Sequence, residues 1–92
     1  MVCIKRVVLD VLKPHQPNAL EFSQAIAKVG ADYQVRLTVL EVDEKTESVQ
    51  VEIRSQAIDF TAVQAAIRDM GASIHSIDEV ESQSERGRDD AG

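Results

Sequence analysis

The chain is short of the residues on which several common kinds of protein depend. Among its 92 residues are one cysteine, Cys3, two prolines, four glycines and no tryptophan, and the aromatic side chains are Phe22, Phe60 and Tyr33. One cysteine cannot form an intrachain disulfide, and Cys3, at the start of the chain, is a poor candidate for a catalytic nucleophile. We therefore expect an aliphatic core and a reducing, cytoplasmic location.

Positive charge and long apolar runs are also scarce. Sixteen acidic residues outnumber ten basic ones, which gives a formal net charge of −6. Since nucleic acid and anionic lipid both repel such a surface, neither a nucleic acid nor a membrane is an expected partner. No apolar run approaches the roughly 20 residues of a membrane-spanning helix, and the order of residues at the N-terminus is wrong for a signal peptide.

The hydrophobic pattern predicts six elements in the order strand, helix, strand, strand, helix, strand. Runs rich in β-branched residues with a period of two predict strands at 4–12, 35–42, 49–54 and 74–80. Asn18 and Asp59 are typical N-caps and predict the starts of two helices. We expect the first helix to end at Gly30 and the second at Gly71, each glycine in the left-handed conformation. From Glu81 the sequence is polar, so residues 1–80 are expected to form one domain and 81–92 a disordered tail.

This order predicts an α+β, ferredoxin-like βαββαβ fold, with a four-stranded antiparallel sheet in the order 4-1-3-2 and both helices on one face. In placing side chains we take the third strand to run parallel to the first. The uncovered face is then expected to carry Arg6, Val8, Asp10, Leu12, Arg36, Thr38, Leu40, Val42, Gln50, Glu52 and Arg54. Four aliphatic residues among these charges predict that copies of the chain cover this face in a homo-oligomer.

Three strings carry a resemblance to a known family. Residues 9–15 (LDVLKPH) and 74–80 (IHSIDEV), with 41–47 (EVDEKTE) between them, resemble a small archaeal family labelled a domain of unknown function. The resemblance implies a ferredoxin-like fold, archaeal origin, a cytoplasmic location and closed homo-oligomers such as a ring, with no established activity. The chain departs from the family at two places. At 32–34 the family tends to have a Gly-Val pair, and near 55–56 it tends to carry a glycine.

The first candidate site lies on the first and fourth strands. Pairing Asp10 opposite His75 also places Arg6 opposite Glu79. The third strand, on the other side of the first, is expected to bring Glu52 or Arg54 near Asp10. Carboxylate oxygens and an imidazole nitrogen could bind a divalent cation, or Asp10 could merely orient His75 at a subunit contact, or the pair could act in acid–base catalysis.

The spacing within the fourth strand predicts a distortion beside this site. Ile74 and Ile77 are three residues apart, so they cannot share one face of a regular strand. A β-bulge near His75 and Ser76 would bring them to the same face, and we expect one there.

The second candidate site is the acidic turn between the second and third strands. Its carboxylates, with others from the end of the fourth strand, could bind Ca²⁺ or Mg²⁺, or they could form a solvated turn with Lys45 as counterion. The residues are Glu41, Asp43, Glu44, Glu47, Asp78, Glu79 and Glu81. His15, between two prolines, is expected to face solvent.

Together these features predict a small cytosolic homo-oligomeric binding or regulatory module, with divalent cations as its ligand. An amino-acid-sensing module with ligands at subunit interfaces is an alternative that rests on fold analogy alone, and the glycine-free loop 13–17 weakens it. An enzyme that uses Asp10 and His75 is the third hypothesis.

Overall fold

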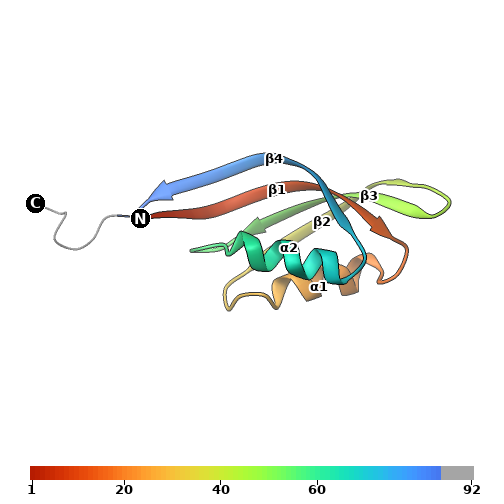
Figure 1. Ribbon diagram of the computed structural model, residues 1–92, viewed down its shortest axis with the longest axis horizontal. Helices are drawn as coiled ribbons and strands as arrows, with labels where there is room; N and C mark the ends of the chain where they lie inside the picture. Colours follow the sequence, from red (N-terminus) through yellow and green to blue (C-terminus); the bar gives the residue numbers. More distant parts are fainter. Residues whose placement is uncertain (86–92) are drawn as a thin grey trace, which may run out of the picture.

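The structure is a computed structural model that describes residues 1–85. Its elements are β1 (Val2–Pro14), α1 (Ala19–Ala27), β2 (Gln34–Val42), β3 (Thr46–Arg54), α2 (Phe60–Asp69) and β4 (Ser73–Ser84). The four strands form one sheet in the order β2-β3-β1-β4, and both helices lie on the same side of it (Figure 1). The predicted ferredoxin-like fold and strand order are confirmed.

Side-chain caps begin both helices where the sequence predicts them. The Asn18 side chain accepts a hydrogen bond from the Glu21 N–H at 2.9 Å, and the Glu21 carboxylate accepts one from the Asn18 N–H at 3.1 Å. Asp59 accepts the Ala62 N–H at 3.0 Å. Gly71 ends α2 with φ of 81°, a conformation that favours glycine.

The predicted left-handed cap at Gly30 is wrong. Within residues 1–85, Gly71 is the glycine with a positive φ, and α1 ends at Ala27 with Lys28 as its C-cap. Gly30 has a different reason to be glycine: a Cβ there would collide with the ring of Tyr33. The Tyr33 hydroxyl in turn accepts the Asp59 N–H at 2.7 Å, next to the start of α2.

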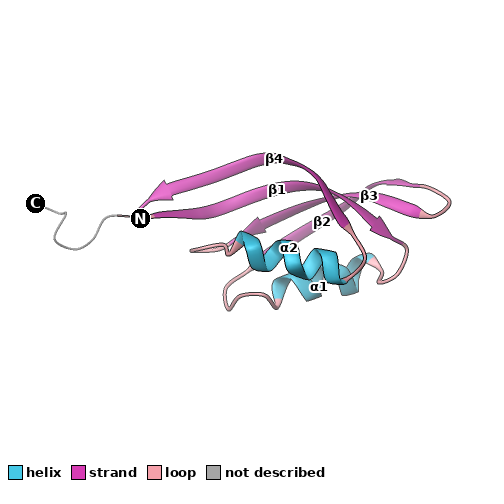
Figure 2. Ribbon diagram, in the orientation of Figure 1, coloured by secondary structure: helices cyan, strands magenta, loops and turns pink. Residues whose placement is uncertain are grey.

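The core is aliphatic apart from Phe22, as the composition predicts. Its residues come from β1 and β3, the two inner strands of the sheet, from the two helices that cover one face of the sheet (Figure 2), and from the segments on either side of α2. They are Val7, Leu9, Val11, Phe22, Ile26, Val49, Val51, Ile53, Ile58, Val63, Ile67 and Ala72.

β3 runs antiparallel to β1, which corrects the parallel arrangement taken from the sequence. Arg6 lies opposite Arg54 and Leu9 opposite Val51. The helical crossover through α1 makes β2 parallel to β1, and the β2–β3 hairpin then reverses the chain. Arginine side chains of β1 and β3 are therefore neighbours on the uncovered face.

Register shifts between β1 and β4 explain the spacing of the β4 apolar residues. The apolar residues of β4 recur every three residues, whereas their partners on β1 recur every two. The pairs are Ile74 with Val11, Ile77 with Leu9, and Val80 with Val7. The extra residues are His75 and Asp78. The predicted bulge near His75 is confirmed, and a second one occurs at Asp78.

The same shifts overturn the predicted pairing at the first candidate site. Asp10 lies opposite Ser76 rather than His75, and Arg6 lies opposite Glu81 rather than Glu79. His75 is skipped in the pairing because it is the extra residue of a bulge.

β4 continues to Ser84, which corrects the expectation that residues 81–84 belong to a disordered tail. The polar side chains of these residues bury little, but their backbone pairs with β1, and Lys5 forms an ion pair with Glu85 at 2.8 Å. The rest of the expected tail, 86–92, lies outside the described residues. Residues 2–4 and 82–84 continue beyond the end of β3 as a two-stranded arm, at the left of Figure 1, and the arm is held at its base, where the Ile4 carbonyl accepts the Ile58 N–H at 2.9 Å.

The uncovered face is less apolar than the sequence predicts. A register shift at Leu40 places Val42 opposite Glu47, and Glu47 lies opposite Lys13 in the helix-facing row. Val42 is therefore on the helix-facing side and not on the uncovered face. Val8 does lie on the uncovered face, but it is buried in a shallow cavity lined by Arg6, Arg36, Thr38, Gln50 and Glu52. Leu12 is 43% exposed on this face, so the face keeps part of the exposed apolar surface that the sequence predicts, but less than expected.

Candidate functional site

Charged side chains gather at two places within residues 1–85. The Lys13 cluster (Lys13, His15 and Glu47) joins the end of β1 to the β2–β3 hairpin. The Arg6 cluster lies on the uncovered face of the sheet and consists of Arg6, Glu52, Arg54, Glu79 and Glu81.

Lys13 is a buried lysine that the sequence analysis did not single out. It continues the helix-facing row of β1, two residues after Val11, and its exposed fraction is 0%. Its Nζ lies 5.8 Å from the centroid of the Phe22 ring and donates to the carbonyl of Pro14 at 2.8 Å. It also lies 3.2 Å from Oε1 of Glu47. The apolar stem therefore packs in the core while the ammonium is fully hydrogen-bonded.

His15 holds the other oxygen of the same carboxylate. Its Nδ1 lies 2.9 Å from Oε2 of Glu47, and its Nε2 lies 3.0 Å from the carbonyl oxygen of Glu44. Both partners are acceptors, so the arrangement suits the doubly protonated ring, which donates from both nitrogens. The hydrogen bond to Glu47 raises the pKa of His15, and the bond from His15, followed by that from Lys13, lowers the pKa of Glu47.

Two expectations change as a result. His15 is partly exposed, but it fixes the hairpin instead of simply facing solvent. Glu47, a predicted cation ligand, has both oxygens occupied by cationic partners.

Arg6 is the centre of the second cluster. Its Nε donates to Glu52, and its Nη1 donates to Oε1 of Glu79 at 2.7 Å and lies 3.5 Å from Oε2 of Glu81. Arg54 also donates to Glu52, at 3.3 Å. The hydrogen bonds to Glu79 and Glu52 raise the pKa of Arg6, and Arg6 holds the pKa of Glu52 below its usual range. Glu52 is therefore bound to arginines, where the sequence analysis placed it beside Asp10 as a ligand.

Asp10 and His75 do line the same cavity, although they are not paired. It measures about 290 Å³, is shallow, and is also lined by Val11, Leu12 and Ser48. The cavity combines one carboxylate and one imidazole, which is too few side-chain ligands for a closed metal site.

The remaining predicted ligands are dispersed. Asp78 accepts a hydrogen bond from the Ser76 hydroxyl at 2.7 Å, Glu41 lies opposite Ser48, and the Asp43 N–H donates to Thr46 at 2.8 Å. Across residues 1–85, no three His, Cys, Asp or Glu side chains come together in a way that could hold a metal ion. A Ca²⁺ or Mg²⁺ site at these residues stays a prediction, and it would need ligands from elsewhere.

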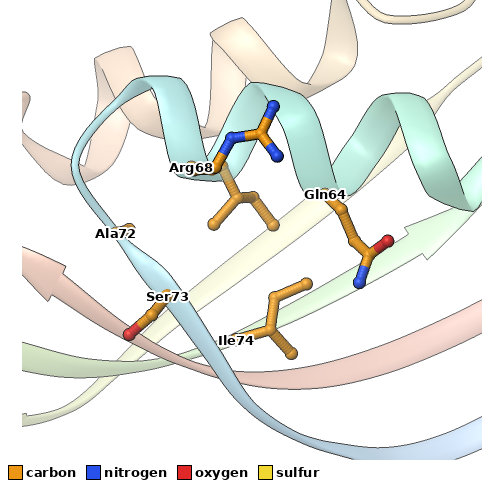
Figure 3. A pocket seen from close by; sticks show the side chains of 6 residues that line it. Gln64, Arg68, Ala72, Ser73 and Ile74 are labelled. Carbon is orange, nitrogen blue, oxygen red and sulfur yellow. The ribbon is translucent and has the colours of Figure 1, made fainter.

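A further cavity of about 290 Å³ lies between α2 and β4. Figure 3 shows Gln64 and Arg68 extending from α2, with Ser73 and Ile74 on the neighbouring strand. Arg68 is largely exposed and lies 3.9 Å from Asp69, so its guanidinium is not aimed into an enclosed site. This cavity offers no cluster of chemically active groups.

The described helices, α1 and α2, are too short and too polar to cross a membrane.

Comparison with known proteins places the chain in a family. Residues 5–85 match the model of the DUF211 family, described as "Uncharacterized ArCR". The chain is also 42% identical, over 77 residues, to "Uncharacterized protein MJ0319" of Methanocaldococcus jannaschii; the match covers 84% of this chain and 79% of that protein. The match confirms the resemblance stated from residues 9–15, 41–47 and 74–80. The chain belongs to the DUF211 family of uncharacterised archaeal proteins.

Proposed function

We propose that this protein is a cytoplasmic homo-oligomeric binding module whose subunits pack end to end. The observation that supports the proposal is the distribution of exposed apolar side chains in a subunit that measures 58 × 22 × 17 Å. Apart from Met1, Leu12 and Leu20, they lie in two groups, one at the β2–β3 hairpin and one along the edge strand β4 and the start of β1. The arm patch consists of Val2, Ile77 and Val80, and the hairpin patch consists of Val39, Leu40 and Val42.

One residue of the arm patch, Val2, belongs to a segment that gains little stability by itself, and the other two lie on the neighbouring part of the edge strand β4. Ile77 and Val80 lie opposite the buried Leu9 and Val7, yet Val80 is 52% exposed. Farther along, residues 2–4 pair with β4 but not with β3. A two-stranded ribbon is marginally stable in water, so packing against another copy would stabilise it.

The hairpin patch lies near the other end of the sheet, where Leu40 is 58% exposed. A contact between two different patches is heterologous, and it forms a closed ring when the rotation between neighbours closes. Patches of this kind are uncommon on monomers and typical of association surfaces. Burial of the arm patch of one copy by the hairpin patch of the next would remove both from water.

We place any Ca²⁺ or Mg²⁺ site at contacts between copies. The predicted ligands Glu41 and Asp43 lie beside the hairpin patch, and within one subunit they do not meet a third ligand. Carboxylates from a neighbouring copy could complete the oxygen shell that these cations prefer.

Light scattering coupled to size-exclusion chromatography tests the proposal. We expect the wild-type chain to have a mass several times its 10.1 kDa, and Val80→Asp and Leu40→Asp each to lower that mass. Thr61→Asp, on the exposed surface of α2, is the matched control and should leave it unchanged. A wild-type chain that stays monomeric at every concentration would refute the proposal. Runs in EDTA and in Ca²⁺ or Mg²⁺ test the cation: unchanged masses and thermal midpoints would refute cation binding alone.

A further inference from the structure

We propose that copies of this chain join at the edges of their sheets, with β4 of one copy adding as a further strand beside β2 of the next. This inference rests on the proposed self-association, and it specifies the geometry in which the arm patch and the hairpin patch meet. It assigns a role to the two outermost strands of the sheet.

The two outermost strands each offer a free edge. Within residues 1–85, the order β2-β3-β1-β4 gives β2 and β4 a neighbouring strand on one side only. Such an edge presents a row of N–H and C=O groups that can pair with another chain. All neighbouring strands of the sheet are antiparallel, so β4 and β2 run in opposite directions. Two copies in the same orientation therefore continue the antiparallel pattern where these edges meet.

The strand registers match the two edges row by row when neighbouring copies lie level with one another. Residues of β2 and β4 that belong to the same row across the sheet then lie opposite each other at the joint. The pairs, with the β4 residue first, are Glu81 with Gln34, Val80 with Val35, Glu79 with Arg36, Ile77 with Leu37, Ser76 with Thr38, and Ile74 with Val39.

The helix-facing side of this joint is apolar. Ile77 and Val80 are 51% and 52% exposed in the single subunit, and Val39 is 42% exposed. At the joint, Ile77 lies opposite Leu37 and diagonal to Val39 of the next copy, so the arm and hairpin patches contribute to one apolar row. The joint removes from water apolar surface that each edge leaves exposed.

The other side of the joint pairs unlike charges. Arg36 is exposed, and the Glu79 side chain is 57% exposed although its Oε1 accepts a hydrogen bond from Arg6. Opposite charges that face each other on neighbouring strands stabilise a sheet. Residues 79–81 pair with β1 without a register shift, so this part of the edge is regular despite the bulges earlier in β4.

Pairing of like edges satisfies these residues less completely. Two β4 strands paired through their regular parts would place Glu79 and Glu81 of different copies beside one another, which is repulsive. Two β2 strands centred on Thr38 would pair Arg36 with Glu41, but they would leave the apolar residues of β4 in water. The unlike edges supply partners for both strands. Such a contact is heterologous, and it forms a ring when the rotation between copies closes.

Disulfide cross-linking tests both the partner strand and the register. Opposite Cα atoms of antiparallel strands are about 4.5–5.5 Å apart, a separation that a disulfide spans. Val35→Cys/Val80→Cys, made together with Cys3→Ser, should therefore give a ladder of covalent multiples of 10.1 kDa on a non-reducing gel after mild oxidation. Within one subunit these positions are separated by three strand spacings, about 14 Å, so an intrachain disulfide cannot form.

The matched control is Val39→Cys/Val80→Cys in the same Cys3→Ser chain. In level copies its two positions are four rows apart, about 13 Å along the strands, so it should give no ladder. If thermal melts show that Val35→Cys/Val80→Cys unfolds, Leu37→Cys/Ile77→Cys, the next pair of the apolar row, takes its place.

Three results would overturn the inference: no ladder from the opposed pair, a ladder from the control pair instead, or covalent dimers of Thr38→Cys instead. The second would show a contact shifted along the strands, and the third would show β2 paired with itself. An oligomeric wild type would in those cases still support the proposed function, whereas a monomeric wild type would overturn both.

Discussion

Replacement of the buried Lys13 tests whether its apolar stem or its charge contributes more to stability. The side chain is fully buried, its ammonium lies 5.8 Å from the centroid of the Phe22 ring, and it binds Glu47 and the carbonyls of Pro14 and His15. Lys13→Met keeps a side chain of similar length but removes the charge. Lys13→Ala removes both.

The structure sets the size of each effect. In Lys13→Met the two carbonyls lose a donor, which costs about 1–3 kcal/mol for a buried group, but the cost of burying an ammonium also disappears. We therefore expect a net loss of about 1–2 kcal/mol. Lys13→Ala also removes three buried methylenes at about 0.8 kcal/mol each, so its loss should be about 2.4 kcal/mol larger.

Urea denaturation followed by circular dichroism, at one fixed protein concentration, measures these differences. A gap of about 2.4 kcal/mol corresponds to roughly 10–20 °C in Tm for a domain of this size. Lys28→Met, at an exposed lysine, is the control and should have almost no effect. Equal losses in Lys13→Met and Lys13→Ala would refute the reasoning, because the charge and not the stem would then dominate.

Three further predictions concern stability. His15→Gln should flatten the pH dependence of stability. The raised pKa of His15 contributes stability that is complete below pH 6.5 and is lost as the pH rises through the folded-state pKa. Urea titrations in which the variant keeps the wild-type dependence of unfolding free energy on pH would contradict this. Gly30→Ala should displace Tyr33 and lower stability by about 1–3 kcal/mol, and an unchanged Tm would show that the ring moves aside freely. Asp32→Asn should remove stability that the wild type has above pH 3.8 and loses as the pH falls through the lowered pKa of Asp32. A difference in stability between the two chains that does not shrink as the pH falls, or no difference at neutral pH, would exclude that contribution.

Local patterns were sufficient to predict the fold. Asn18 and Asp59 begin helices because their side chains accept backbone N–H groups, a property that depends on a few neighbouring residues. The three-residue spacing of Ile74 and Ile77 likewise revealed a bulge, because a regular strand cannot place both on one face.

The charged clusters depend on register, which the sequence specifies less directly. One bulge removes His75 from the pairing with Asp10, and after the second Glu79 lies opposite Val8, two residues along β1 from Arg6. A side chain as long as arginine still reaches Glu79, so the predicted ion pair forms without the predicted register. A one-residue shift has this effect because side chains alternate between faces.

Lys13 could have been found from its position. It follows Val7, Leu9 and Val11 at the same spacing of two, which places it in the core-facing row. The alternation was read as ending at Leu12 because prolines follow. A lysine that extends an apolar row is a signal for a buried ion pair, and here Glu47 provides the partner.

The two loops at which the sequence analysis expects a departure from the family touch one another in the structure. The Asp32 carboxylate accepts hydrogen bonds from the Ser55 hydroxyl at 2.7 Å and from the Gln56 N–H at 2.9 Å. These bonds tie the loop before β2 to the loop after β3. A side-chain link thus fixes both loops in this chain.

The mass of the wild-type chain in solution is the most direct test of end-to-end packing. Sedimentation equilibrium over a wide range of protein concentrations should give a multiple of 10.1 kDa, with a smaller mass for Val80→Asp under the same conditions. A mass of 10.1 kDa throughout, equal for both chains, would contradict the account.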